Sequence, residues 1–106
     1  MEEWKDMILE RLDAAYKARF EKDQALIFLN DAYQDALFWK MQVSNSDRQD
    51  FTAFMQEFME IRDLFIGLLV DRYPSNYHEV KVKLEHLRTG NDVAIKFFPN
   101  ASTSLA

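Results

Sequence analysis

The chain has 106 residues, and 48% of them are hydrophobic, including nine Phe, four Tyr and two Trp; this supplies the core of one domain and excludes a disordered chain. It has no cysteine, which excludes disulfides, thiolate nucleophiles and cysteine-ligated zinc. The net charge of −5 is uneven, with −7 on residues 1–71 and +2 on residues 72–106, so we expect the acidic body to repel nucleic acid and to favour a protein partner.

The first two predicted helices fill the part of the chain that lacks glycine and proline. The two Gly and two Pro all lie at or after residue 67, so the preceding sequence has a helical composition. Apolar residues at helical spacing predict one helix over about 2–20 and a second over about 24–42. Nothing between the two forces a break, so a single long rod is the alternative. We predict two helices, because one rod could not bury both apolar stripes within one chain.

The third predicted helix, over about 46–73, has the strongest pattern. Ser46 and Gln49 have the spacing of a capping box, in which each side chain bonds the backbone N–H of the other residue. Pro74 ends the helix, because a proline disfavours helical backbone at the residue before it. Between these limits apolar residues alternate in steps of three and four, as in a helix central to a bundle: Phe51, Phe54, Phe58, Ile61, Phe65 and Leu68.

After the third helix the sequence supports two interpretations. Asn76 as a cap and Gly90 as a stop predict a helix over 76–89. Strand-like alternation on both sides of a TGND turn predicts instead a small β-hairpin over 79–98. We favour the helix, because its cap and its stop both fit, and we expect a short further helix or strand over 92–98.

These elements together predict an all-α fold. We expect a compact up-and-down bundle of four main helices that forms a single domain over 1–98, followed by a flexible polar tail over 99–106. The alternative is three helices plus a small C-terminal β-hairpin over 79–98.

Neither a membrane span nor a targeting segment is expected. The longest apolar run, over 64–70, is seven residues with a glycine inside it, whereas a membrane-spanning helix needs about 20. The N-terminal MEEWKDMILE is acidic where a secretion signal is basic. We therefore predict a cytoplasmic protein that does not act on a membrane.

Arg72 and His78 are the candidate catalytic pair. They are separated by five residues, and this spacing resembles that of HEPN-type ribonucleases, compact all-helical dimers that carry an Arg, four to six residues, and then a His. The resemblance implies that Arg72 holds the scissile phosphate and that His78 serves in acid–base chemistry without a metal. That family usually has a small polar residue after the Arg, whereas Tyr73 and Pro74 follow here. We favour a helix corner, in which Arg72 is the cation that suits a helix C-terminus, and keep the metal-independent ribonuclease as the alternative.

Glu57, Glu60 and Asp63 form an E-x-x-E-x-x-D run, which resembles the metal-binding helix of the all-helical MazG-type nucleotide pyrophosphatases. Those enzymes also need paired glutamates on the preceding helix, where this chain offers only Asp31 and Asp35. The three acids turn progressively away from the apolar seam of their own helix, so we predict a solvated outer face. No Glu is followed three residues later by a His, as di-iron sites in helical bundles require. We therefore expect no metal and no cofactor.

The second predicted helix carries more apolar surface than one core needs. Its residues Ile27, Phe28, Phe38 and Trp39 lie off its main stripe. A four-helix monomer of this size buries one side of each helix, so these residues predict a second burial partner, either another copy of the chain or a target protein. Deep burial of the same residues within a compact bundle is the alternative.

The sequence therefore favours a non-enzymatic protein-binding module that acts through an aromatic helical face and an acidic surface. We expect an inhibitor, adaptor or accessory chaperone of bacterial or phage type, which binds a protein partner or itself as a homodimer and does not bind nucleic acid directly. A structural subunit of a larger assembly is a further alternative.

Overall fold

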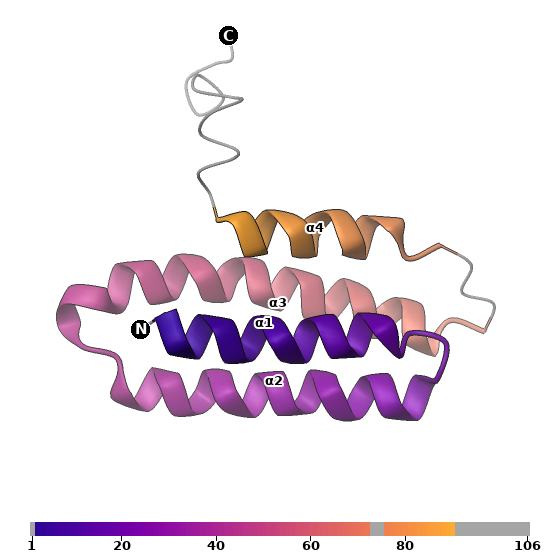
Figure 1. The fold of residues 1–106 in the computed structure, drawn as a ribbon, viewed down its shortest axis with the longest axis horizontal. Coiled ribbons are helices and arrows are strands. Elements are labelled where there is room, and N and C mark those ends of the chain that lie inside the picture. The colour runs from indigo at the N-terminus through magenta and orange to yellow at the C-terminus, as the bar shows by residue number, and fades with distance from the viewer. Residues whose placement is uncertain (1, 73–75, 91–106) are drawn as a thin grey trace, which may run out of the picture.

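A computed structural model of the chain describes residues 2–72 and 76–90. The described part contains four α-helices and no strand, and successive helices run in opposite directions (Figure 1). This confirms the predicted all-α, up-and-down bundle of four helices. The elements are α1 (Glu2–Lys17), α2 (Lys22–Gln42), the short 3-10 turn η1 (Asn45–Asp47), α3 (Arg48–Val70) and α4 (His78–Thr89).

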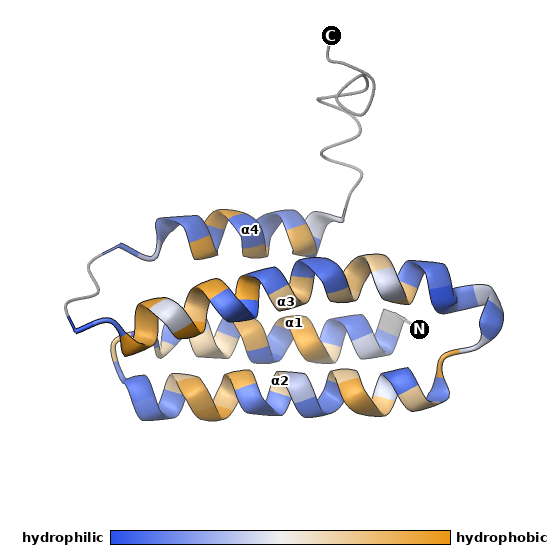
Figure 2. Ribbon diagram, turned by 180° about the vertical axis from the view of Figure 1, so that it is seen from behind, coloured by the Kyte–Doolittle hydropathy of each residue, from blue (hydrophilic) through white to orange (hydrophobic). Residues whose placement is uncertain are grey.

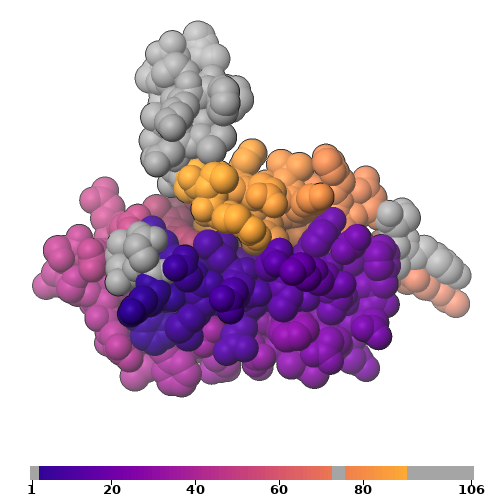
Figure 3. Space-filling model, in the orientation of Figure 1, coloured from indigo at the N-terminus to yellow at the C-terminus, as the bar shows by residue number. Residues whose placement is uncertain are grey.

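The four helices form a diamond in which α1 and α3 lie between α2 and α4. Both α1 and α3 pack against α2 and against α4. Figure 1 shows α2 and α4 at opposite edges with α1 toward the viewer, and Figure 2, seen from behind, places α3 in front of α1. The outer side of α2 therefore has no described helix against it, and in the space-filling view α2 forms the lower edge of the molecule (Figure 3).

The α1–α2 pair has the closest backbone approach of all the helix pairs. Small side chains at the contact explain this, because alanine lets two helix backbones come near each other. Ala15 on α1 and Ala25, Ala32 and Ala36 on α2 are fully buried. The remaining core is filled by larger side chains, above all Trp39, Phe58, Phe65, Ile8, Leu12, Leu29, Ile61 and Val80.

A short non-helical link over 18–21 separates α1 from α2, which confirms the two-helix prediction. The guanidinium of Arg19 holds this link in place. Its Nη1 donates a hydrogen bond of 2.9 Å to the carbonyl oxygen of Tyr16, which also accepts the backbone N–H of Arg19 at 3.1 Å. The same guanidinium lies over the rings of Tyr16, at 4.3 Å, and Phe20, at 4.7 Å.

The start of α3 differs from the prediction. The capping box of Ser46 with Gln49 does not form, and the helix begins at Arg48 with no side-chain hydrogen bond to its cap. Ser46 lies instead in the 3-10 turn, where its hydroxyl contacts that of Ser44 at 3.0 Å. The Ser44 hydroxyl in turn donates to the carboxylate of Asp47 at 3.2 Å, so local side-chain bonds replace the expected cap.

Residues 78–89 are helical, so the alternative β-hairpin over 79–98 is wrong for this stretch. The N-cap of α4 is Tyr77 rather than the predicted Asn76, but the side-chain oxygen of Asn76, one residue earlier, accepts the backbone N–H of His78 at 2.8 Å. Gly90 ends it with a positive φ of 81°, which only glycine adopts at little cost. The buried face of α4 is made by Val80, Leu84 and Leu87. The predicted further element over 92–98 and the tail over 99–106 lie outside the described residues.

Candidate protein-interaction surface

The two sides of α2 are both apolar, but only one faces the core. The buried side carries Ala25, Leu29, Ala32, Asp35, Ala36 and Trp39. On the opposite side the side chains of Ile27 and Phe38 are each 53% exposed and that of Met41 is 80% exposed. With 3.6 residues per turn, these three positions lie along one line of the helix. Single exposed apolar side chains are ordinary, whereas an aligned row marks an interaction surface.

The four predicted interface residues separate into three environments. Ile27 and Phe38 lie on the outer side of α2. Phe28 is half-buried and lines a shallow hollow beside Met7, Glu10, Arg11 and Ala14 of α1. Trp39 belongs to the core, since it is 2% exposed and its ring centroid lies 4.8 Å from that of Phe51 and 5.5 Å from that of Phe54. Trp39 is therefore not available to a partner.

Met41 is the residue of this surface that the sequence prediction missed. It is the most exposed large apolar side chain among the described residues. The signal is present in the sequence, because Met41 follows Phe38 by three residues and so lies on the same helix face. The prediction stopped at the aromatic residues and did not follow the helical period to its end.

Polar residues interrupt the outer row of α2. We call the six positions Gln24, Ile27, Asp31, Gln34, Phe38 and Met41 the α2 outer seam. Arg11 of α1 lies at its edge, with Nη1 3.7 Å from the carboxylate of Asp31 and Nε 3.1 Å from that of Asp35. The hydrogen bond and negative charge of Asp35 raise the pKa of Arg11. Asp31 therefore has a cation beside it within the same chain.

Arg72 and His78 have different surroundings among the described residues. Arg72 lines a hollow of about 320 Å³ at one end of the bundle, together with Arg19, Phe20 and Tyr77. His78 is not among the described residues that line this hollow. It is the exposed first residue of α4.

The acidic run on α3 divides between solvent and α4. Glu60 is exposed, as is Asp63, which pairs with Arg62 at 3.7 Å. Glu57 is half-buried in a small hollow lined also by Lys83 and His86 of α4. Burial, followed by repulsion from Glu60, raises the pKa of the Glu57 carboxyl, while His86 and Lys83 act in the opposite direction. Within residues 2–72 and 76–90, no group of three or more acidic, His or Cys side chains could hold a metal ion.

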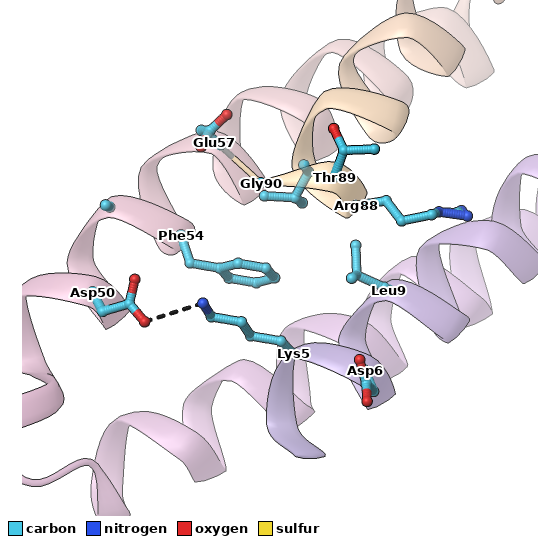
Figure 4. Close-up of a pocket in the computed structure, with 11 residues that line it drawn as sticks. Lys5, Asp6, Leu9, Asp50, Phe54, Glu57, Arg88, Thr89 and Gly90 are labelled. Carbon is cyan, nitrogen blue, oxygen red and sulfur yellow. Dashed lines mark hydrogen bonds and ion pairs between the residues drawn. The ribbon is translucent and has the colours of Figure 1, made fainter. Parts of the chain in front are cut away.

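A hollow of about 370 Å³ lies between the N-terminal halves of α1 and α3 and the end of α4. Figure 4 shows the ring of Phe54 near its centre, with Lys5 beside it and Gly90 at its far side. The Nζ of Lys5 is 3.0 Å from the carboxylate of Asp50 and 5.8 Å from the centroid of the Phe54 ring. These charges pair with each other across two helices, an arrangement typical of ion pairs that tie helix ends together.

The fold and this surface define a small all-α protein, a four-helix bundle with an uncovered apolar row on one helix. None of the described helices combines the length and the apolar character that crossing a membrane requires. Comparison of the chain with models of protein families, with curated proteins and with solved structures finds no match.

Proposed function

We propose that this chain is a non-enzymatic protein-interaction module and that the α2 outer seam is its binding surface. The observation that carries the proposal is the exposed row of Ile27, Phe38 and Met41 on a helix whose other side is already buried in the core. From Ile27 to Met41 the row extends over about 21 Å at 1.5 Å per residue. A row of this length can seat one helix or one extended segment of another protein.

The acidic body supports a protein partner. Residues 1–71 carry a net charge of −7, and Glu21, Asp23 and Asp31 lie near or on the outer side of α2. Such a surface steers a basic protein toward it and repels a phosphate backbone. An inhibitor, adaptor or accessory chaperone that covers the basic groove of a nucleic-acid-binding protein would use both features. Binding of this kind weakens steeply as salt is added.

The proposal is tested with one double variant and one matched control. Ile27→Ser with Phe38→Ser removes the apolar row, and Val82→Ser removes a partly exposed apolar side chain from α4. Each purified, tagged protein is used to capture partners from a lysate of its native cells at low and high salt, after equal folding has been verified by circular dichroism. We expect the wild type and Val82→Ser to retain the same proteins and the double variant to lose them. Equal capture by all three proteins would contradict the proposal.

A further inference from the structure

The α2 outer seam has the spacing of a coiled-coil interface. Its six positions follow one another in steps of three, four, three, four and three residues, which is the alternation of a and d positions in a heptad repeat. This seam is separate from the core side of α2, where Leu29 and Ala36 are buried. Another helix of matching pattern can therefore pack along α2 without disturbing the bundle.

The seam is also symmetric about its own midpoint. Antiparallel helices pair an a position with a d position, and a second α2 laid antiparallel on this one forms such pairs over the whole seam. Ile27 then meets Phe38 of the partner subunit, Asp31 meets Gln34 of the partner subunit, and Gln24 meets Met41 of the partner subunit. Ile27 and Phe38 form an apolar pair, Met41 packs against the aliphatic part of Gln24, and the carboxylate of Asp31 faces an amide that can donate a hydrogen bond to it.

We propose that the partner seated on this seam is a second copy of the same chain, whose α2 lies antiparallel with the two-fold axis between positions 32 and 33. The inference rests on the proposed function, because it takes the α2 outer seam to be an interaction surface. A two-fold contact of this kind is isologous, so that each pairing occurs twice, once on either side of the axis.

The polar centre of the seam selects the antiparallel arrangement. In a parallel pair Asp31 would face Asp31 of the partner subunit, and like charges at one layer oppose association. In the antiparallel pair each Asp31 accepts from the partner's Gln34 and keeps Arg11 of its own chain 3.7 Å away. The carboxylate is therefore compensated on both sides. A polar layer between the two Ile27–Phe38 pairs fixes the register of the two helices.

The apolar area that the seam exposes limits the affinity of the dimer. Given the exposed fractions of Ile27, Phe38 and Met41, large side chains of roughly 200 Å² contribute on the order of 300 Å² of apolar surface per copy. Two such rows and their polar borders reach only the lower end of specific interfaces, about 1,000 Å² in total. We expect a dimer that dissociates at micromolar concentration, and therefore a sedimentation coefficient that rises with protein concentration.

Cysteine cross-linking tests the register directly, because the chain has no cysteine of its own. Ile27→Cys and Phe38→Cys are prepared separately, with tags of different size, and are incubated alone or mixed in a glutathione redox buffer. We expect a disulfide in the mixture and none in either variant alone. In the proposed register the two copies of position 27 are 11 residues apart along the axis, about 16 Å, and a disulfide needs Cα atoms within about 7 Å. A mixture of Phe38→Cys with Val82→Cys serves as the control and is expected to remain uncrosslinked.

The polar layer provides a second test that leaves the apolar row intact. Gln34→Glu places two carboxylates against each other at the centre and is expected to weaken self-association at least tenfold. Adding Asp31→Asn restores an amide–carboxylate pair and is expected to recover most of that loss. Sedimentation equilibrium from 1 to 200 µM measures both effects. A cross-link in Ile27→Cys alone, or no recovery in the double variant, would overturn the antiparallel register.

The outcomes for the dimer and for the proposed function are distinguishable. A wild-type chain that sediments as a monomer at 200 µM overturns the dimer, while loss of a captured partner by the Ile27→Ser, Phe38→Ser variant leaves the interaction surface standing. A wild-type dimer whose association is unaffected by that double variant overturns the proposed dimer alone, because the copies then meet through another surface, and the capture experiment still decides the proposed function.

Discussion

The guanidinium of Arg11 on α1 lies 3.1 Å from the carboxylate of Asp35 on α2, and it neutralises the one charged side chain that is buried among the described residues. Asp35 is 8% exposed, so it depends on this partner for much of the hydrogen bonding that water would otherwise supply. The pair joins the two helices with the closest contact in the bundle, and it lies directly beside the α2 outer seam.

Removal of Arg11 is expected to destabilise the fold more than removal of the Asp35 charge. Arg11→Ala leaves the buried carboxylate of Asp35 without its cation. We expect a loss of about 1–3 kcal/mol in the free energy of unfolding, which is the cost of one unsatisfied buried polar group. The Arg11 side chain is partly exposed, so its removal adds little to this cost. Asp35→Asn keeps the volume and a hydrogen-bonding group and should cost less. Urea unfolding followed by circular dichroism measures both. An equal or larger loss for Asp35→Asn would contradict this ranking, because losing the charge would then cost as much as leaving the buried carboxylate without its cation.

Phe38 and Trp39 are adjacent in sequence, but Phe38 is exposed to solvent and Trp39 is buried in the core. Trp39→Ala removes a core side chain packed edge-on against Phe51 and Phe54 and is expected to cost about 3–5 kcal/mol of unfolding free energy. Phe38→Ala is expected to change the stability of the monomer by no more than about 0.5 kcal/mol, as for most surface substitutions. Denaturation at a protein concentration low enough to keep the chain monomeric checks the contrast. Comparable losses in the two variants would place Phe38 in the core as well.

The four helices could be predicted from the sequence, and a helix end could be predicted where contacts between neighbouring residues determine it. The positive φ of Gly90 is set within a few residues, so the end of α4 at Thr89 could be predicted, whereas the helix begins at His78, two residues after the predicted start. The capping box at Ser46 failed for the same reason, because Ser44 and Asp47 offered competing local bonds to this turn. The choice between one rod and two helices depended on burial, and it was predicted from that requirement.

The orientation of α2 could not be predicted to the same accuracy. The apolar stripe expected from the sequence runs along Leu26, Leu29, Tyr33, Ala36 and Leu37. The structure buries Leu29 and Ala36 of this set together with Ala25, Ala32 and Trp39, so the core side is rotated from the expected stripe. Alanine carries a weak hydrophobic signal, yet it permits the close approach to α1 that sets the rotation of the helix. Trp39 was placed on the surface by this error of rotation, although Ile27 and Phe38 are outside.

At the corner between α3 and α4, we expect the side chain of Asn76 to contribute more to the stability of the fold than that of His78. Asn76→Ala removes the acceptor of the His78 backbone N–H and should cost about 1 kcal/mol, the usual net contribution of one hydrogen bond. His78→Ala leaves that backbone bond in place and should have little effect on stability. If the purified chain cleaves RNA, a test of His78→Ala and Arg72→Ala decides the ribonuclease alternative, since activity that survives either change excludes this pair as catalytic.

The half-buried carboxyl of Glu57 is expected to make stability depend on pH. Its pKa is raised in the folded chain, first by burial and then by Glu60, above an ordinary value of 4.5. The folded state therefore binds this proton more tightly than the unfolded chain does. The resulting stabilisation is complete below the ordinary value and is lost as the pH rises through the raised folded value. At neutral pH the ionised Glu57 accordingly lowers the stability of the fold.

Glu57→Gln removes the ionisation and should therefore raise the melting temperature at pH 7 relative to the wild type, with a smaller gain at pH 4. Lys83 and His86 of α4 attract the ionised carboxylate, and Glu57→Gln loses this attraction. The expected rise in melting temperature is therefore the benefit of removing a buried charge minus the loss of this attraction. Glu79→Gln, at an exposed position of α4, changes the net charge equally and serves as the control. Thermal unfolding of the three proteins between pH 4 and pH 7 measures the difference. A melting temperature that falls at pH 7 in Glu57→Gln would show that the attraction to α4 outweighs the burial of the charge.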